Sequence, residues 1–421
     1  MIAAVLLLIF IALVGAPLFA VLAAGGLLAS SASDISPDIL IIEMNRLAAT
    51  PNMLALPLFT LAGVIMANGG APQRLVRFYE EALGWLPGGL SIVALITCAF
   101  FTAFSGASGV TILALGGLLY PMLIDEGYRY RFTSGLLTTS GSLGLLFPPS
   151  LAIIIYSIVA GVNIEDMFLA GIIPGLLLIV MLTMYSFFDC RHFNLVKRKF
   201  DFQKFLTGAH GCIWDLMMPI AIIFGIYGGY VSVTEAAAAT ASYVLFIEVV
   251  VYKHLKLEKH LQPILIECCI LFGSLLIIIL IALGLTNLLI DAQIPNRLLA
   301  FMQEYIETKI EFLILLNVFL LIVGATMDIF SAIIVVVPLI LPLAQQYGIH
   351  PAHLGIIFLA NLEIGYSTPP VGINLFIASQ RFKEPVLTLF RACLPFLFVM
   401  IIWLLIITYL PSLSLWLIDD G

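Results

Sequence analysis

The sequence is poor in charge. Asp, Glu, Lys and Arg make up 10% of its 421 residues, whereas a typical soluble domain has about 25%. Hydrophobic residues make up 62%. A water-soluble globule with so few charges would not stay dispersed, which excludes soluble enzymes, nucleic-acid binders and disordered scaffolds. The net charge of −7 gives no reason to expect a polyanionic partner such as a nucleic acid. The chain is therefore predicted to be a polytopic membrane protein.

Motifs for catalysis and for transition metals are also missing. The sequence has no HExxH, no Walker A loop and no nucleophile elbow. Its six cysteines show no CxxC spacing and mostly lie in apolar stretches, where cysteine usually serves as a small core hydrophobe. Its six histidines lie in or near the expected connecting segments. We therefore expect no enzymatic activity, no cofactor and no transition metal.

Long uncharged stretches set the fold class. A helix needs about 20 apolar residues to cross the ~30 Å core of a bilayer. The stretches without Asp, Glu, Lys or Arg suit one or two crossings each, whereas an outer-membrane barrel would show short alternating segments. The sequence therefore predicts an all-α membrane-spanning protein. The uncharged stretches cover 1–33, 47–73, 82–124, 132–164, 167–188, 216–234, 268–290, 329–362 and 392–418.

Two basic segments predict the orientation. Segment 189–204 has five Lys or Arg against two Asp, and segment 253–260 has three Lys against one Glu. Two helices expected between them, at 213–232 and 235–252, would place both segments on one side. That side is predicted to be cytoplasmic, because basic loops stay inside.

Three other segments complete the expected layout. Residues 1–24 are apolar, and no basic residue precedes them, so we expect a first membrane helix there rather than a cleaved signal peptide. Segments 34–46 and 291–311 lean acidic and are expected to face outward.

The chain also matches itself at an offset of about half its length. The matches fall on Gly and Pro, the residues that fix backbone breaks, and this favours two related halves over chance matching. Without a gap, the offset pairs Gly63 with Gly284, Pro121 with Pro342, Gly127 with Gly348, Gly144 with Gly365 and Pro148-Pro149 with Pro369-Pro370. With a two-residue slip, 72–75 (Pro-Gln-Arg-Leu) also pairs with 295–298 (Pro-Asn-Arg-Leu).

Each half contains two interruptions inside apolar stretches. In the first half they are Ser-Gly-Ala-Ser-Gly (105–109) and Gly-Leu-Leu-Phe-Pro-Pro-Ser (144–150); in the second they are Gly-Ala-Thr-Met-Asp (324–328) and Gly-Tyr-Ser-Thr-Pro-Pro-Val-Gly (365–372). A Pro-Pro pair breaks a helix and frees carbonyl groups, which survive at membrane depth only beside protein or water. Such breaks at matching positions indicate a transporter's midplane site, where neutral oxygens could hold Na⁺. The alternative is that they only shape kinks.

Several acidic residues need a role as well. Asp328 and Glu363 lie near the second-half interruptions, where each could bind an ion; otherwise Asp328 could cap a half-helix and Glu363 could bond to nearby backbone. Glu235 has the position of a helix-start acid. Glu248 and Glu267 are expected near the membrane boundaries.

The interruptions resemble those of a known family. The stretches 324–328 and 361–376 (Asn-Leu-Glu-Ile-Gly-Tyr-Ser-Thr-Pro-Pro-Val-Gly-Ile-Asn-Leu-Phe) closely resemble the large membrane subunit of the tripartite ATP-independent periplasmic (TRAP) transporters of bacteria and archaea. The first-half Phe-Ser-Gly-Ala-Ser-Gly (104–109) and Phe-Pro-Pro-Ser (147–150) are similar too, as is Val-Ser-Val-Thr-Glu-Ala-Ala (231–237). The resemblance covers nearly the whole chain.

This resemblance implies an architecture and a function. The family's large subunit is a sodium-driven elevator transporter of the bacterial inner membrane, with inverted repeats, two re-entrant helical hairpins and about eleven transmembrane helices. It works with a small four-helix membrane subunit, expected here as a separate chain, and with a periplasmic substrate-binding protein. The substrates are C4-dicarboxylates, sialic acids and similar carboxylates. The expected units are an N-terminal helix and loop (1–50), a first repeat (51–165), connecting helices (166–262), a second repeat (263–380) and a C-terminal helix (381–421).

The resemblance also implies site residues. One sodium site would use Ser105, Ser108, Gly144, Phe147 and Pro149. The hairpin tip has Ala107 and Gly109 where the family is often richer in Ser and Thr, which makes Thr102 a further candidate. The other sodium site would use Gly324, Thr326, Thr368 and Pro370. The expected substrate vicinity comprises Ser150, Asn361, Gly372 and Asn374.

Two readings from other classes stay open. A divalent-anion/sodium symporter would have similar paired hairpins and would work without a binding protein. An intramembrane enzyme would need a base beside Ser105 or Ser108, and the predicted helix interiors offer neither His nor Lys.

Overall fold

The computed structural model describes most of the chain, and every regular element among the described residues is helical. The expected segments 34–46 and 291–311 and the repeat partner 295–298 fall wholly or largely outside the described residues. These residues are 7–8, 10–11, 17–33, 36, 38, 41–42, 45, 50–191, 193, 195, 200–291, 293, 306 and 308–418.

Long apolar helices dominate the described part of the chain. Eight of them are long and apolar enough to cross a membrane, or up to ten if each of two bent pairs is one span. This confirms the all-α fold, while the implied number of about eleven spans stays a prediction. The α-helices are α2 (Leu18–Ser33), α4 (Ala55–Asn68), α5 (Ala71–Leu83), α6 (Gly89–Ser105), α7 (Ser108–Asp125), α8 (Tyr130–Ser140), α9 (Leu151–Ala160), α10 (Ile164–Cys190), α11 (Phe202–Tyr227), α12 (Val233–Phe246), α13 (Gln262–Asp291), α15 (Lys309–Thr326), α16 (Ile329–Gln346), α17 (Pro351–Gly365), α18 (Ile373–Phe382), α19 (Val386–Tyr409) and α20 (Ser412–Leu415).

Several predicted helix boundaries were wrong. Helix α2 begins at Leu18, directly after Pro17, and ends at Ser33, so it overlaps only the last part of the helix predicted at 1–24 and runs nine residues beyond it. The helix predicted at 213–232 is α11, which begins at residue 202 because Asp201 caps the backbone N–H groups of Gln203 and Lys204. The uncharged-stretch criterion missed this start because α11 contains charged residues.

The following helix, α12, begins close to its predicted start. Ser232 and Glu235 form a capping box there, which confirms Glu235 as a helix-start acid. The α-helix ends at Phe246, short of the predicted 252, where a turn of π-helix continues over 247–251. Hydrogen bonds from Tyr243 to Trp214 and from Tyr252 to Gly211 show that α11 and α12 are antiparallel. The residues before α11 and after α12 therefore lie at the same end of this pair.

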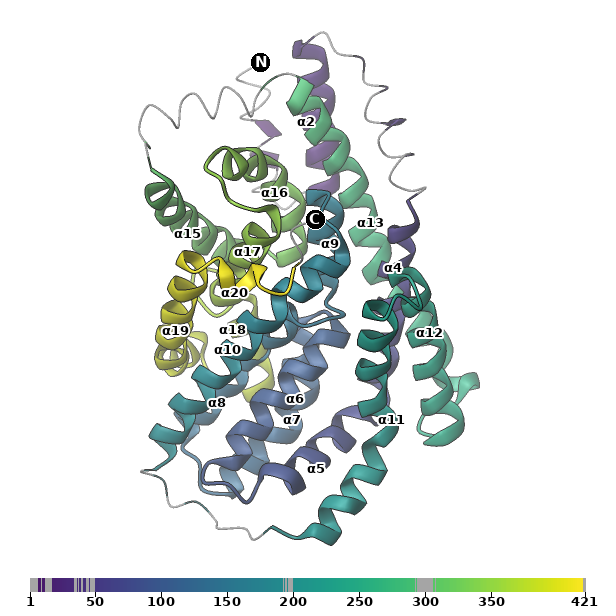
Figure 1. Cartoon of the computed structure of the whole chain (residues 1–421), viewed down its shortest axis with the longest axis vertical. Coiled ribbons are helices and arrows are strands. Elements are labelled where there is room, and N and C mark those ends of the chain that lie inside the picture. Colours follow the sequence, from purple (N-terminus) through teal and green to yellow (C-terminus); the bar gives the residue numbers. More distant parts are fainter. Residues whose placement is uncertain are drawn as a thin grey trace.

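Two helical hairpins and two broken helices recur in the same order (Figure 1). The first hairpin is α6–α7, and the second is α15–α16. The first broken helix comprises α8, the 3₁₀ turn η2 (Leu143–Leu146) and α9; the second comprises α17 and α18. A Pro-Pro pair with a cis peptide bond lies in each break, at Pro148-Pro149 and Pro369-Pro370.

Contacts between these elements are reciprocal. The first arm of each hairpin packs on its own half, α6 against η2 and α15 against α17. The second arm crosses to the other half, so that α7 packs against α18 and α16 packs against α9. This is the arrangement expected of two related halves.

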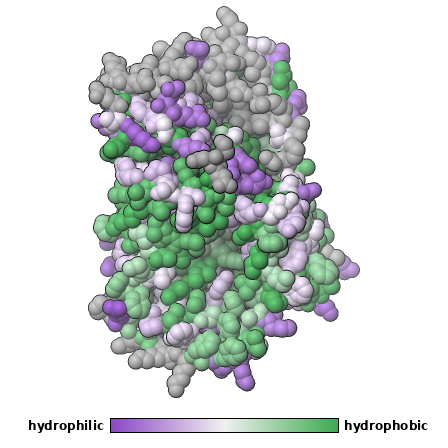
Figure 2. Space-filling view, in the orientation of Figure 1, coloured by the Kyte–Doolittle hydropathy of each residue, from purple (hydrophilic) through white to green (hydrophobic). Residues whose placement is uncertain are grey.

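A flank of helices borders the hairpins. Figure 1 shows α4, α11, α12 and α13 along one side of the molecule, and α5 connects this flank to the first hairpin. Hydrophobic residues cover a broad central band of the visible surface, with hydrophilic residues gathered above it and along its lower rim (Figure 2). That distribution suits a protein whose middle is surrounded by lipid.

Candidate functional site

The tip of the first hairpin lies against the first break. Helix α6 ends at Ser105, and Gly106 turns the chain with a φ of +66° before α7 begins at Ser108. A Cβ at Gly106 would lie 2.7 Å from the Cγ of Leu151, the first residue of α9, so only glycine allows this approach. Ser105 is half-buried and Ser108 is buried.

Gly144, in η2, packs against helix α6 of the hairpin. A Cβ at Gly144 would collide with the carbonyl oxygen of Ala99 and the amide of Ala103, both in α6. The structure therefore brings Gly144 together with the hairpin tip. Thr102 is already engaged, because its hydroxyl bonds to the Gly141 carbonyl at 2.8 Å and to the Thr111 hydroxyl at 2.7 Å. The Ser105 hydroxyl makes only long contacts, 3.4 Å to the Ala107 carbonyl and 3.5 Å to the Thr111 hydroxyl.

The second tip meets the second break in the same way. Gly324 and Gly365 pack backbone to backbone, and a Cβ at Gly324 would lie 2.9 Å from the Cα of Leu362. The carbonyl of Ala325 accepts hydrogen bonds from the amides of Val371 at 3.0 Å and Gly372 at 3.3 Å. The predicted residues Gly324, Thr368 and Pro370 therefore lie in one region.

The two threonines of the second region differ in their surroundings. Thr368 is half-buried and donates to the Ile364 carbonyl at 3.0 Å. Thr326 is exposed, and its hydroxyl bonds to the carbonyls of Ile322 and Val323 in its own helix. Thr368 is thus the more enclosed of the two predicted ligands.

Both regions offer neutral oxygens. Hydroxyl and carbonyl groups are ligands that hard cations prefer. In the part of the chain that the structure describes, no group of three or more His, Cys, Asp and Glu side chains could hold a metal ion. Such neutral oxygens suit a hard cation better than a soft transition metal.

The residues predicted near a substrate have different surroundings. Ser150 is fully buried at the start of α9, and its hydroxyl has no hydrogen-bond partner. Gly372 precedes α18 with a φ of +51°. Asn374 donates to the Thr138 carbonyl in α8 at 3.5 Å, and its side-chain oxygen is unpartnered. Asn361 instead bonds to Asn317 of α15 at 2.7 Å, on the side of α17 that faces the second hairpin.

Asp328 and Glu363 have different surroundings. Asp328 caps α16 through the amide of Ser331 at 3.0 Å, as one of the two expectations had it. Glu363 is fully buried in α17, and neither carboxyl oxygen has a hydrogen-bond partner. The expectation that Glu363 bonds to nearby backbone is therefore wrong, because the backbone N–H groups within a helix already donate to carbonyl groups of the same helix.

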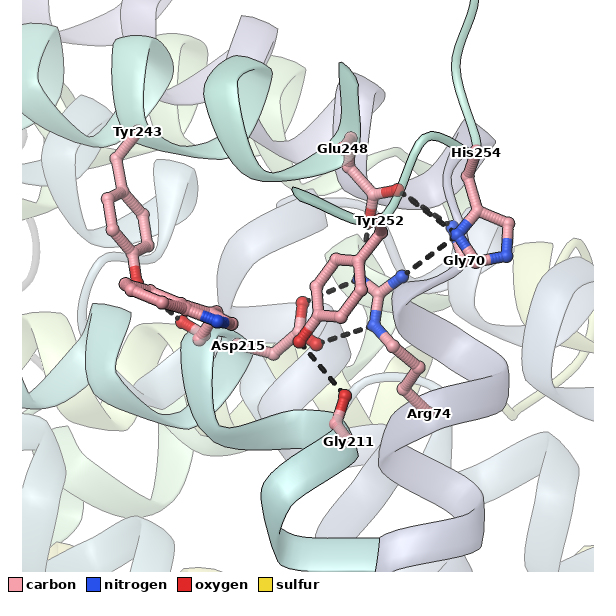
Figure 3. A network of polar contacts seen from close by, with 9 residues as sticks. Gly70, Arg74, Gly211, Asp215, Tyr243, Glu248, Tyr252 and His254 are labelled. Carbon is pink, nitrogen blue, oxygen red and sulfur yellow. Dashed lines mark hydrogen bonds and ion pairs between the residues drawn. The ribbon is translucent and has the colours of Figure 1, made fainter. Parts of the chain in front are cut away.

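Sequence reasoning missed the charged cluster beside the flank (Figure 3). The guanidinium of Arg74 in α5 bonds to both oxygens of Asp215 in α11 at 2.7 and 2.8 Å, and to Glu248 at 2.5 Å. Asp215 and Glu248 are 1% and 0% exposed. For Glu248 the sequence predicted only a place near a membrane boundary. In the sequence, the only indication of this cluster was that Arg74, Asp215 and Glu248 lie beside apolar stretches, where an unpaired charge is costly.

The cysteines match expectation, whereas His210, expected in or near a connecting segment, lies inside α11. All six cysteines are free, and five of them are buried, as small core hydrophobes would be. His353 follows a connecting segment, as expected, but it is buried and bonds to the hydroxyl of Ser414 at 2.7 Å.

Comparisons with known proteins agree with this architecture. The chain matches the family described as "Tripartite ATP-independent periplasmic transporter, DctM component" over residues 2–413. It is 35% identical to the C4-dicarboxylate TRAP transporter large permease protein DctM of Vibrio cholerae, covering 89% of this chain and 87% of that protein. It is 30% identical to the ectoine TRAP transporter large permease protein TeaC of Halomonas elongata, covering 87% and 86%.

Two further comparisons add a relative with another named cargo and a solved structure. The chain is 34% identical to the isethionate TRAP transporter permease protein DctMQ of Oleidesulfovibrio alaskensis, covering 86% of this chain and 57% of that protein. Its fold resembles the crystal structure of the YdaH transporter of Alcanivorax borkumensis, with a TM-score of 0.65 and 13% identity over 89% of this chain and 87% of the other. At that identity the likeness concerns the fold alone.

Proposed function

The chain belongs to the family of the DctM component of tripartite ATP-independent periplasmic transporters, and from this premise we propose that it imports a small organic acid driven by sodium. It is thus a membrane transport protein. The cargo in this proposal is a C4-dicarboxylate, a sialic acid or a similar carboxylate. The membrane is the bacterial inner membrane, with the basic segments at 189–204 and 253–260 on the cytoplasmic side.

Two partners belong to the proposal. A small four-helix membrane subunit would stand beside this chain, and a periplasmic binding protein would deliver the organic acid. The names of the relatives, which cover C4-dicarboxylate, ectoine and isethionate, support a family whose cargo varies while the permease architecture persists. The binding protein would then choose the cargo.

One observation carries the sodium proposal. Each hairpin tip lies against the Pro-Pro break of its own half, and each contact gathers neutral oxygens around close-packed glycines. A sodium ion at each contact would join the hairpin tip to the break. The first ion would be bound by Ser105, Ser108, Gly144, Phe147 and Pro149, and the second by Gly324, Thr326, Thr368 and Pro370. The starts of α9 and α18 would favour an anion nearby, because helix N-termini carry partial positive charge.

The reciprocal packing supports an elevator-type movement. Because α7 packs on α18 and α16 packs on α9, the hairpins and broken helices form one interlocked group. In the proposal this group moves along the flank of α4, α11, α12 and α13 with the cargo enclosed. ATP has no part in the cycle.

Uptake into proteoliposomes tests the proposal. The chain is reconstituted with its small subunit and binding protein, and uptake of a labelled dicarboxylate is measured in an inward Na⁺ or K⁺ gradient without ATP. Ser105→Ala and Thr368→Ala should each raise the Na⁺ concentration for half-maximal uptake, while Ser242→Ala, an exposed hydroxyl on α12, should not. Equal uptake in the two gradients would refute sodium coupling. Full uptake without the binding protein would favour a stand-alone symporter.

A further inference from the structure

The Arg74 cluster joins three elements that are distant in the sequence. Arg74 lies in the first turn of α5, Asp215 lies within α11, and Glu248 lies in the π-helical turn after α12. The two-pronged contact between Arg74 and Asp215 fixes the guanidinium plane, because a guanidinium matches a carboxylate in only a few orientations. The ring of Tyr252 covers one face of the guanidinium, and the central carbon of the guanidinium lies 3.6 Å from the ring centroid.

The cluster is located at an elbow in the chain. Helices α4 and α5 meet at Gly69-Gly70 and are bent by 71°. The amide of Gly70 donates to Glu248 at 3.2 Å, so Glu248 caps the start of α5, which has no side-chain cap of its own. A Cβ at Gly69 would lie 2.7 Å from a carboxyl oxygen of Glu248. The absence of side chains at Gly69 and Gly70 therefore lets Glu248, in the turn after α12, approach the elbow closely.

Helix α4 links this elbow to the first hairpin tip. Gly63 of α4 lies about 9 Å before the elbow along the helix, at 1.5 Å per residue. A Cβ at Gly63 would collide with the carbonyl of Phe104 and would lie 2.9 Å from the Cα of Ser105. The helix that the cluster holds is thus the one against which the tip rests.

We propose that Arg74, held by Asp215 and Glu248, is a positioning residue for the first sodium site: it fixes the elbow of α4 and α5 so that α4 supports the tip at Ser105 in the state that the structure shows. This inference rests on the proposed function. The second tip, at Gly324, has no corresponding contact with α4 among those described. Loosening the elbow should therefore affect the first site and spare the second.

Single and then double variants of the reconstituted transporter test the positioning role of Arg74. Asp215→Asn removes the two-pronged contact and keeps Arg74 paired with Glu248, and Glu248→Gln provides a second, milder variant should the first fold poorly. The readout is the Na⁺ concentration for half-maximal uptake. We expect about a tenfold rise with Asp215→Asn, within the range of couplings between sites in proteins. The concentration of dicarboxylate for half-maximal uptake should change much less.

The double variants distinguish positioning from a general structural effect. Asp215→Asn combined with Ser105→Ala should be little worse than Ser105→Ala alone, since both act on the first site. Asp215→Asn combined with Thr368→Ala should show the product of the two single effects. If the effects multiply in both pairs, the cluster is only structural and the inference is overturned. If neither Ser105→Ala nor Thr368→Ala alone alters the sodium dependence, the proposed function itself fails and the inference fails with it.

Discussion

The hairpin tips and the elbow hold their parts together by opposite means. At the tips, backbone meets backbone through Gly144, Gly324 and Gly365, and the proposed sodium ligands there are neutral hydroxyl and carbonyl groups. At the elbow, one cation and two buried carboxylates make the contact. Neutral oxygens leave room for an exchangeable ion, whereas paired charges are costly to separate. In the proposed mechanism the tips therefore bind and release an ion, whereas the elbow stays closed.

Breaking the elbow should have the largest effect on stability. Arg74→Gln would leave Asp215 and Glu248 buried without their cation, which typically costs about 3–5 kcal/mol. We expect a large drop in the melting temperature of the purified protein. Arg77→Gln on the same helix is the control, because Arg77 is exposed. Equal melting temperatures for the two variants would mean that the cluster contributes nothing to the fold.

A methyl group at a tip should have the next largest effect. Gly365→Ala would force its Cβ into the backbone of Gly324, and overpacking of this kind costs about 1–3 kcal/mol. Uptake should fall more than stability, because the tip could no longer close on its break. Gly273→Ala on α13 is the matched control, since a Cβ at that position would have no packing neighbour within 4 Å. Normal sodium-driven uptake by Gly365→Ala would contradict the tight approach of tip and break.

Ser150→Ala should affect transport and leave stability alone. The Ser150 hydroxyl is buried and has no partner, so its loss removes no hydrogen bond from the protein. If it bonds to the carboxylate cargo, that bond is worth about 1.5–3 kcal/mol, and the half-saturating cargo concentration should rise about tenfold or more. Ser186→Ala, another buried unpartnered hydroxyl, serves as the control on α10. Identical transport by both variants would remove Ser150 from the substrate vicinity.

Glu363→Gln should have the smallest effect. A buried carboxyl group without a partner avoids the cost of a bare charge only in its neutral form, which glutamine imitates in size. The melting temperature and sodium-driven uptake should both stay close to wild type. Loss of uptake at an unchanged melting temperature would instead assign Glu363 a charged role in the cycle.

The contrast between tips and elbow also explains what the sequence could predict. Gly and Pro at the breaks leave a signal at fixed spacing, so the repeat from Gly144 to Gly365 could be anticipated from the residues, whereas the pairing of tip with break was implied by the family resemblance. The Arg74 cluster left no such signal, because its three charges come from positions 74, 215 and 248 and meet only through the packing of α5, α11 and α12. The start of α11 was missed for a related reason: Asp215 ends the uncharged stretch but not the helix.

The most direct test of the sodium proposal is the melting temperature of the purified chain in NaCl and in KCl at equal ionic strength. A ligand that binds only the folded state at a hundred times its Kd adds about 2.7 kcal/mol of stability. We predict a higher melting temperature in NaCl for the wild type and for Ser242→Ala, and a smaller rise for Ser105→Ala and Thr368→Ala. The same melting temperature in both salts for every variant would contradict sodium sites at the hairpin tips.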